Sequence, residues 1–271
     1  MDVDANATEW SRRRLILMFG GVIVFVALVI SGLSYAVVTA FDPTGDSSPT
    51  ATATRDVAVG PDGTRGTEYR DGVAAAPMLQ ANETDMEPAA PALDPSPSML
   101  IDSPRSSGLA AVPSGFRRSP EGAAGQLAAI EIAALAPMSI RYARDVYDHW
   151  AAQPSGFERW EIAQSIQMFH QAAGTVDGDG SVSVTATPVG VQIKGTDGPD
   201  WVLACVQLDV TTTVEQQTRF GFGHCERMQW SQDRWTIGPG KPPAQAPSTW
   251  PGSDRSVEAG WLLWTETDDH E

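Results

Sequence analysis

Residues 201–230 read WVLACVQLDVTTTVEQQTRFGFGHCERMQW, and this stretch decides the fold. Its first part, residues 201–213, is rich in Val, Leu and Thr. Its second part, residues 218–230, alternates Phe and other apolar residues with polar residues or Gly. Such alternation is typical of a strand with one buried face, and the polar residues 214–217 suit a reversal. We therefore predict an antiparallel hairpin.

Cys205 and Cys225, the two cysteines of the chain, fix the register of this hairpin. Directly opposed Cα atoms of antiparallel strands lie about 4.5–5.5 Å apart, which a disulfide can span. A slip by one residue would turn polar side chains into the core, so the hydrophobic pattern supports the same register. We expect a Cys205–Cys225 disulfide, with two free buried thiols as the alternative. The predicted apolar face carries Val202, Ala204, Val206, Leu208, Val210, Phe220, Phe222, Met228 and Trp230.

Two polar residues, His224 and Glu226, interrupt this apolar face. Buried polar groups need hydrogen-bond partners or water. One interpretation is a pocket lined by Val206, Phe222, His224 and Glu226. The alternatives are polar groups satisfied within the core, or positions at the open end of the sheet.

The N-terminal part predicts a membrane anchor. Residues 15–41 carry no charge and would reach about 40 Å as a helix, more than the roughly 30 Å of a bilayer core. Three arginines precede this segment, so we expect residues 1–14 in the cytoplasm and the rest of the chain outside, on a single-pass protein of the cell membrane. A cleaved signal peptide is the alternative, although the apolar run is long for one.

Residues 42–115 are rich in Pro, Ala, Ser, Thr and Asp and show no sustained hydrophobic period. We expect a disordered linker there, because such a segment cannot bury enough apolar surface to offset its ordering entropy. The folded extracytoplasmic domain is predicted to span residues 116–238.

This domain is predicted to be α+β, with three helices packed on a curved antiparallel sheet of at least four strands. This prediction rests on apolar residues at helical spacing in all three helices. It also rests on Ser, Pro and Glu at the start of the first helix. The helices are expected at residues 120–136, 140–153 and 157–173. Further strands are expected at residues 181–194, with a bulge near Pro188, and around residues 235–237.

The C-terminal tail, residues 239–271, is rich in Pro and Trp, and Ser253 can cap a short helix in it. Trp250, Trp261 and Trp264 are costly to expose. We expect them to fold back on the domain, with a docking patch for a partner as the alternative.

Composition and motifs exclude several functions. The net charge is −16, so nucleic-acid binding through a basic face is disfavoured. The sequence has no nucleophile elbow, zinc-protease motif, phosphate loop or dinucleotide fingerprint, and its four histidines lack metal-site spacing. We therefore expect a non-enzyme without cofactor or metal. If any pair transfers a proton, it is His224 with Glu226, supported by Tyr142 or Tyr147.

Helices followed by a curved sheet, behind one membrane helix, resemble the cone-shaped fold of the nuclear-transport-factor-two, or cystatin-like, superfamily. That plan is similar to the bitopic assembly component of type IV secretion and conjugation systems. The stretches FRRSPEGAAGQLAAIE, GTDGPDWVLACVQLDV, GHCERMQW and APSTWPGSDRSVEAGW resemble an uncharacterised family of actinobacterial membrane-anchored proteins associated with conjugation-type gene clusters. The resemblance implies assembly with other envelope or secretion-apparatus proteins as a scaffold. The alternative is an accessory module that binds a small molecule or lipid in the cone.

Overall fold

The computed structural model describes residues 59–60 and 63–267. The predicted membrane helix at residues 15–41 lies outside them. No helix within the described part of the chain is long and apolar enough to cross a membrane.

The central hairpin forms as the sequence predicts. Strands β5 (Trp201–Thr213) and β6 (Gln217–Ser231) pair antiparallel, with Cys205 opposite Cys225 and Val206 opposite His224. This confirms the predicted register. It brings the two cysteines together as a disulfide-compatible pair, with sulfur atoms 1.98 Å apart.

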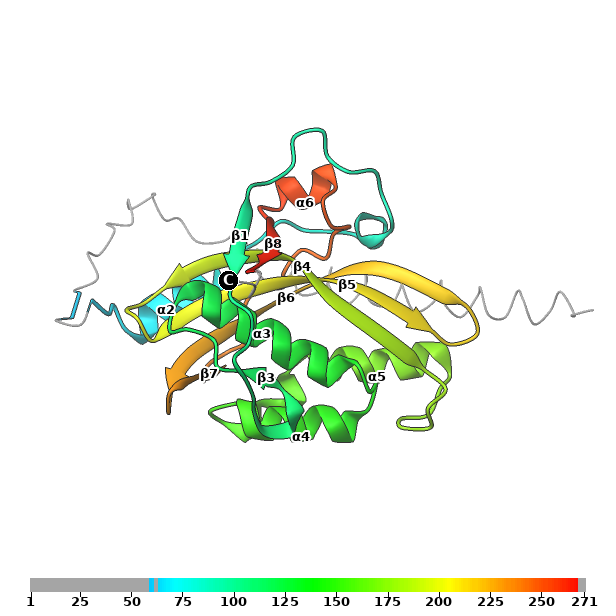
Figure 1. Ribbon diagram of the computed structural model, residues 1–271, viewed down its shortest axis with the longest axis horizontal. Coiled ribbons are helices and arrows are strands. Elements are labelled where there is room, and N and C mark those ends of the chain that lie inside the picture. The colour runs from blue at the N-terminus through cyan, green and yellow to red at the C-terminus, as the bar shows by residue number, and fades with distance from the viewer. Residues whose placement is uncertain (1–58, 61–62, 268–271) are drawn as a thin grey trace, which may run out of the picture. The chain divides into compact units, whose positions relative to one another are not determined.

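Four more strands extend the hairpin into a curled six-stranded sheet of order β1-β8-β4-β5-β6-β7 (Figure 1). Strand β4 (Ser183–Thr196) pairs with β5, and its register shifts between Pro188 and Gly190, at the predicted bulge. A second shift falls between Ile193 and Gly195. Strand β7 (Arg234–Ile237) closes the far edge. The fold is therefore α+β, and the bulged β4 suits the curl of the sheet.

Three helices cover one face of the sheet (Figure 1). Helix α3 (Pro120–Leu135) begins after Ser119, which accepts a hydrogen bond from the Gly122 N–H. Helix α4 (Ile140–Trp150) follows it. Helix α5 (Glu161–Ala173) starts later than predicted, because residues Pro154–Arg159 form a 3₁₀ helix, η3, instead.

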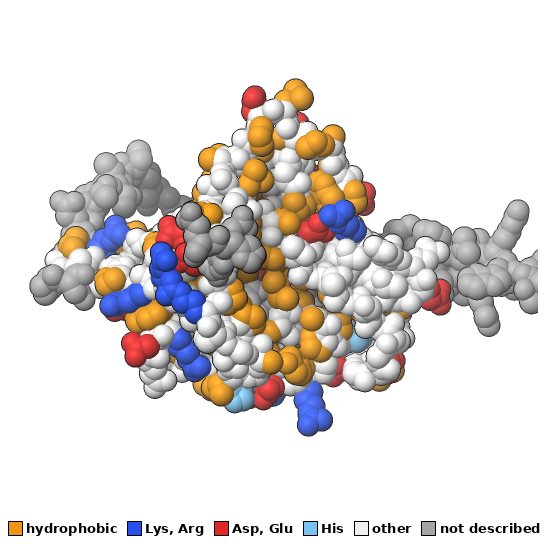
Figure 2. Space-filling model, viewed as in Figure 1, with side chains coloured by type: hydrophobic (Ala, Val, Ile, Leu, Met, Phe, Trp, Pro, Cys, Tyr) orange, Lys and Arg blue, Asp and Glu red, His pale blue; other side chains and the backbone are white. Residues whose placement is uncertain are grey.

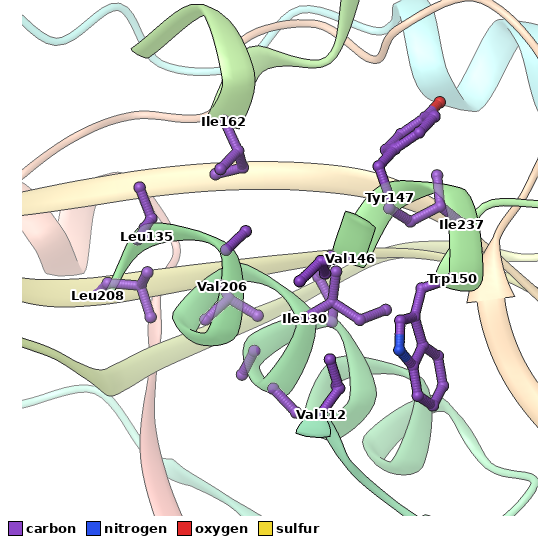
Figure 3. Packing of buried hydrophobic residues seen from close by; sticks show 14 of the residues in the cluster. Val112, Ile130, Leu135, Val146, Tyr147, Trp150, Ile162, Val206, Leu208 and Ile237 are labelled. Carbon is purple, nitrogen blue, oxygen red and sulfur yellow. The ribbon is translucent and has the colours of Figure 1, made fainter. Parts of the chain in front are cut away.

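The space between these helices and the sheet is filled by side chains (Figure 3). Aliphatic residues of α3, α4 and α5 form one buried cluster with the apolar face of β5, and Trp150 lies at one end of it. Residues with no exposed surface include Leu127, Ile130, Val146, Trp150, Ile162, Ile166, Val206 and Leu208. The concave side of the sheet is therefore a packed core.

The N-terminal arm, which we define as residues 63–115, differs from the expected linker. It contains α2 (Thr67–Ala75), η1 (Glu83–Met86), β1 (Ser98–Ile101), β2 (Ser106–Ser107), η2 (Leu109–Ala111) and β3 (Pro113–Ser114). These elements are short and only weakly periodic, so they gain their order from tertiary contacts. The fully buried Asp197 carboxylate accepts hydrogen bonds from Arg65 N, Gly66 N and Arg70 Nε at 2.5, 3.0 and 2.6 Å.

The C-terminal tail also belongs to the domain. Ser253 caps helix α6 (Asp254–Glu258) by accepting the Ser256 N–H at 3.2 Å, as predicted. The chain then adds an unpredicted strand, β8 (Leu262–Glu266), which pairs antiparallel with β4 and parallel with β1. Arm and tail thus share one edge of the sheet.

The tail crosses the second face of the hairpin at two glycines. A Cβ atom on Gly221 would lie 1.8 Å from the Thr249 carbonyl oxygen, and one on Gly223 would lie 2.6 Å from that of Pro247. The Gln207 amide donates to the same Thr249 oxygen at 2.8 Å. Only glycine permits this approach, so the sheet is covered on both faces.

We expect Gly221→Ala to destabilise the domain by at least about 2 kcal/mol, because a methyl group there must push the tail off the sheet. The free energy of unfolding of the full-length chain in urea measures this. Gly72→Ala is the matched control, since Gly72 lies within α2 with no other atom near its Cβ position. The control should stabilise by roughly 0.5–1 kcal/mol. Equal unfolding midpoints for the two variants would contradict the docked tail.

Candidate functional site

The most unusual group of side chains lies inside the core, between β6 and α3. His224 of β6 has 1 % of its side chain exposed, and Glu131 of α3 has none. His224 Nδ1 lies 2.7 Å from Glu131 Oε1, a hydrogen-bonded ion-pair geometry. Glu131 Oε2 has no hydrogen-bond partner among the described residues. This pair ties the first helix to the sheet.

Two further carboxylates face the other ring nitrogen of His224. Nε2 lies 3.5 Å from Glu226 Oε1 and 3.9 Å from Glu161 Oε2. Glu226 is 12 % exposed and Glu161 is 33 % exposed. The Phe222 ring stacks beside the imidazole, with centroids 6.4 Å apart. The acidic groups therefore run from the buried Glu131 toward the surface.

Burial and charge act together on the protonation of this cluster. Burial alone would lower the pKa of His224, but the charge and hydrogen bond of Glu131, aided by Glu226 and Glu161, raise it to about 9. Burial raises the pKa of Glu226 to about 7 against the opposing charge of His224. Burial also raises the pKa of Glu131. The imidazole is therefore protonated at neutral pH.

Of the two tyrosines suggested by the sequence, only Tyr147 adjoins this cluster. It shares a small cavity of about 40 Å³ with Glu226 and Trp160. Burial, and then the negative charge of Glu226, raise the pKa of Tyr147 to about 12, so the phenol stays protonated. The Tyr142 hydroxyl donates instead to the Ala110 carbonyl oxygen at 3.3 Å.

A groove of about 740 Å³ opens above the cluster; we call it the arm groove. Residues 79–86 of the arm, 161–168 of α5 and 242–248 of the tail border it. Glu161 and Phe222 line the groove and also neighbour His224, so they separate the buried imidazole from solvent.

The four residues of the predicted pocket lie beside one another on the hairpin: Val206 pairs with His224, and Phe222 and Glu226 flank the imidazole. Val206 and His224 are buried and border neither the arm groove nor the apolar cavity beneath α5. Phe222 lines the arm groove and a separate apolar cavity of about 70 Å³, and Glu226 lines the small cavity beside Tyr147. Phe222 and Glu226 therefore border different openings, and these openings do not form one shared pocket around the four residues.

Glu131 and Glu161 were not singled out in the sequence. Glu131 is the one charged residue within LAAIEIAALA, an otherwise apolar helical run, and this was the signal that could have found it. Glu161 stands in the first turn of α5, where an acidic residue is ordinary, so no local signal marks it.

The three tail tryptophans pack against the domain. Trp261 is 2 % exposed, contacts the disulfide cluster and donates to the Pro247 carbonyl oxygen at 3.1 Å. Trp264 lies in β8 opposite Met99. The Trp250 N–H donates to the Asp85 carbonyl oxygen at 2.6 Å.

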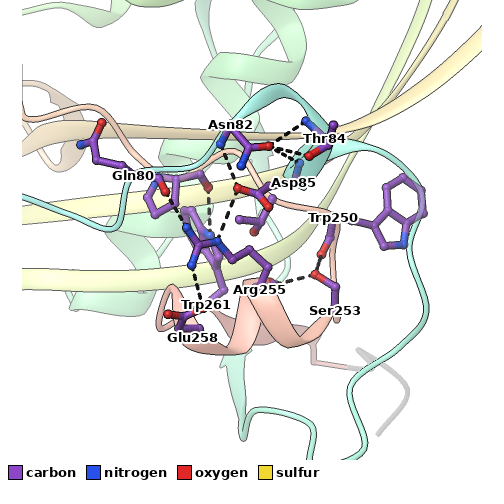
Figure 4. Close-up of polar contacts among 12 residues, drawn as sticks. Gln80, Asn82, Thr84, Asp85, Trp250, Ser253, Arg255, Glu258 and Trp261 are labelled. Carbon is purple, nitrogen blue, oxygen red and sulfur yellow. Dashed lines mark hydrogen bonds and ion pairs between the residues drawn. The ribbon is translucent and has the colours of Figure 1, made fainter.

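Polar contacts fix this part of the tail to the arm (Figure 4). The Arg255 guanidinium donates to the Gln80 carbonyl oxygen at 2.7 Å and pairs with Asp85 and Glu258. In the arm, Asn82 forms a capping box with Asp85. The tail and arm therefore hold one another in place on the outer face of the sheet.

Within the part of the chain that the structure describes, no group of three or more His, Cys, Asp and Glu side chains could hold a metal ion. Comparison with known proteins gives no match to a family model, a curated protein or a solved structure.

The cluster predicts a definite pH dependence of stability. His224 and Glu226 both have a higher pKa in the folded chain than when unfolded, so the folded state binds more protons. The stability that these two protons give to the folded state is fully present at low pH. It is lost as the pH rises through the folded-state pKa, about 7 for Glu226 and about 9 for His224. The slope is roughly 1.4 kcal/mol per pH unit for each proton.

Glu226→Gln tests this assignment, because the amide stays neutral at every pH. We expect the free energy of unfolding of the variant to fall less steeply between about pH 4.5 and 7, by one proton's slope, because Glu131 still contributes there. The decline due to His224 should remain and move to lower pH, because the charge of Glu226 no longer raises the His224 pKa. Urea unfolding at half-unit pH steps measures it, with exposed Glu68→Gln as the charge-matched control. Parallel curves for wild type and Glu226→Gln would overturn the assignment.

Proposed function

We propose that the chain is a non-enzymatic, membrane-anchored extracytoplasmic assembly component that acts through its outer surface. The filled interior between the sheet and helices α3, α4 and α5 carries this proposal. Because side chains fill the core, a partner can contact only the outer surface of the domain. A conjugation or type IV secretion-like apparatus is the setting that the sequence resemblance suggests.

The arrangement of helices on the sheet, the disulfide and the N-terminal apolar segment support the same proposal. Three helices on one face of a curled sheet suit a cystatin-like cone, the plan of the bitopic assembly component. The cross-strand disulfide suits an oxidising compartment outside the cytoplasm. The apolar segment at residues 15–41 would anchor the domain to the cell membrane.

Binding of a ligand inside the cone has little support. The apolar cavity between α5 and the sheet measures about 70 Å³, whereas small-molecule sites usually measure roughly 300–1,000 Å³. An isomerase- or hydratase-like reaction would need His224 within reach of a substrate, and that side chain is 1 % exposed.

The arm groove is the surface that we assign to a protein partner. It is bordered by Leu79 and Met86 of the arm and by Met168 of α5, which is 56 % exposed. Flexible methionines are common at binding surfaces. Trp261 is buried, so the tail tryptophans are less suited to a partner than the sequence alone suggested. The groove volume also fits a small molecule, which is the second candidate.

Crosslinking in native membranes tests the assembly role. Full-length tagged chain should capture envelope proteins, and Met168→Glu should reduce their yield at least about fivefold by placing a charge in the groove. Val176→Glu is the matched control, because Val176 is 67 % exposed in a turn away from the groove lining. Recovery of no envelope protein, or equal loss in both variants, would contradict the proposal. Co-purification of a small molecule that Met168→Glu releases would favour the second candidate.

A further inference from the structure

A second opening, which we call the cationic pocket, lies between α2, η3, β6 and the loop after β7. It measures about 620 Å³. Its charged lining residues are Arg70, Asp71, Arg159, Arg227 and Lys241. Four cations and one carboxylate are a marked local excess of positive charge in a chain with 34 acidic and 18 basic residues. On the face shown in Figure 2, Lys and Arg side chains also gather toward the end that carries α2 and β7.

Ion pairs neutralise only half of these cations. Arg70 Nε lies 2.6 Å from the buried Asp197 carboxylate, and Arg227 Nη2 lies 2.8 Å from Asp71. Arg159 and Lys241 are exposed and form no ion pair with any residue that the structure describes. The pocket therefore keeps about two uncompensated positive charges.

Arg227 is held in place by the loop that follows β7. Its side chain is 5 % exposed, and its Nε donates to the Lys241 carbonyl oxygen at 2.9 Å. Gly238 N–H donates to the Arg227 carbonyl oxygen at 2.6 Å. Gly240 has φ +133°, and a Cβ atom there would lie 2.9 Å from the guanidinium. A fixed guanidinium loses little entropy when it binds an anion, so this wall of the pocket is preorganised.

We propose that the cationic pocket binds the phosphate group of a phosphate ester. Two uncompensated cations match the charge of a phosphomonoester dianion, and guanidinium groups form bidentate hydrogen bonds with phosphate oxygens. Thr67 and Gln229, which also line the pocket, supply neutral hydrogen-bonding groups. The pocket is larger than inorganic phosphate, so the ligand carries an organic remainder. This inference is independent of the assembly role.

Two sources share this chemistry: a soluble phosphate ester and a phospholipid headgroup. The test uses the full-length chain in a neutral detergent, titrated by calorimetry with glycerol 3-phosphate. A parallel arm uses dihexanoyl phosphatidic acid, a phosphomonoester lipid, below its micelle concentration, with dihexanoyl phosphatidylcholine as the zwitterionic comparison. We expect saturable binding of glycerol 3-phosphate that sodium phosphate displaces. Tighter binding of the phosphatidic acid than of both other ligands would identify the lipid as the source.

Arg159→Gln and Lys241→Gln should each weaken binding about tenfold, because each removes a charged hydrogen-bond donor. Both side chains are exposed, so neither change leaves a buried group unpaired. Arg141→Gln is the matched control: Arg141 is exposed on α4, outside the pocket lining, and its loss should leave affinity unchanged. Absence of saturable binding, or equal affinity in all three variants, would overturn the proposal.

Discussion

The β5–β6 hairpin must bury both of its faces, and the rest of the structure follows from this constraint. One face is apolar and packs under α3, α4 and α5. The other face carries the disulfide, Gln207 and two glycines, and it would expose a broad surface if left uncovered. The tail lies directly on the backbone at Gly221 and Gly223, and the Gln207 amide fixes it there. The arm then packs beside the tail, with Met78 and Leu79 against the disulfide cluster.

This double covering decides what the domain can do. Helices on one side and arm and tail on the other leave the core closed, and the large openings lie at the borders between these layers. The arm groove and the cationic pocket both lie at such borders, and Arg159 and Pro242 line both. The buried pair of His224 and Glu131 adds a charged link between helix and sheet beneath the groove. Such a buried pair adds little net stability, because desolvating both charges costs nearly as much as their attraction returns.

Features marked by a local sequence pattern were predicted, and features that depend on contacts with distant residues were not. The hairpin register followed from residue alternation and from Cys205 and Cys225, and the bulge near Pro188 followed from a change of phase. The arm was wrongly expected to be a linker, because its order comes from distant groups such as the Asp197 carboxylate. The strand β8 was missed for the same reason, since it is defined by its pairing with β4 and β1. At the candidate site, His224 and Glu226 stood out as polar residues on an apolar face. Their partner Glu131 lies 93 positions away on a helix, and no pattern within β6 points to it.

Hydrogen exchange of the full-length chain tests the central claim, that arm and tail are integral layers of the domain. The informative amides are those of Ala244, Trp250 and Leu263, which donate to the carbonyl oxygens of Ala74, Asp85 and Pro97. We predict that these amides exchange at least about a thousandfold more slowly than those of an unstructured chain, at rates close to those of the β5 amides. Exchange at the unstructured rate while β5 and β6 stay protected would show a hairpin with one open face and would contradict the docking of arm and tail.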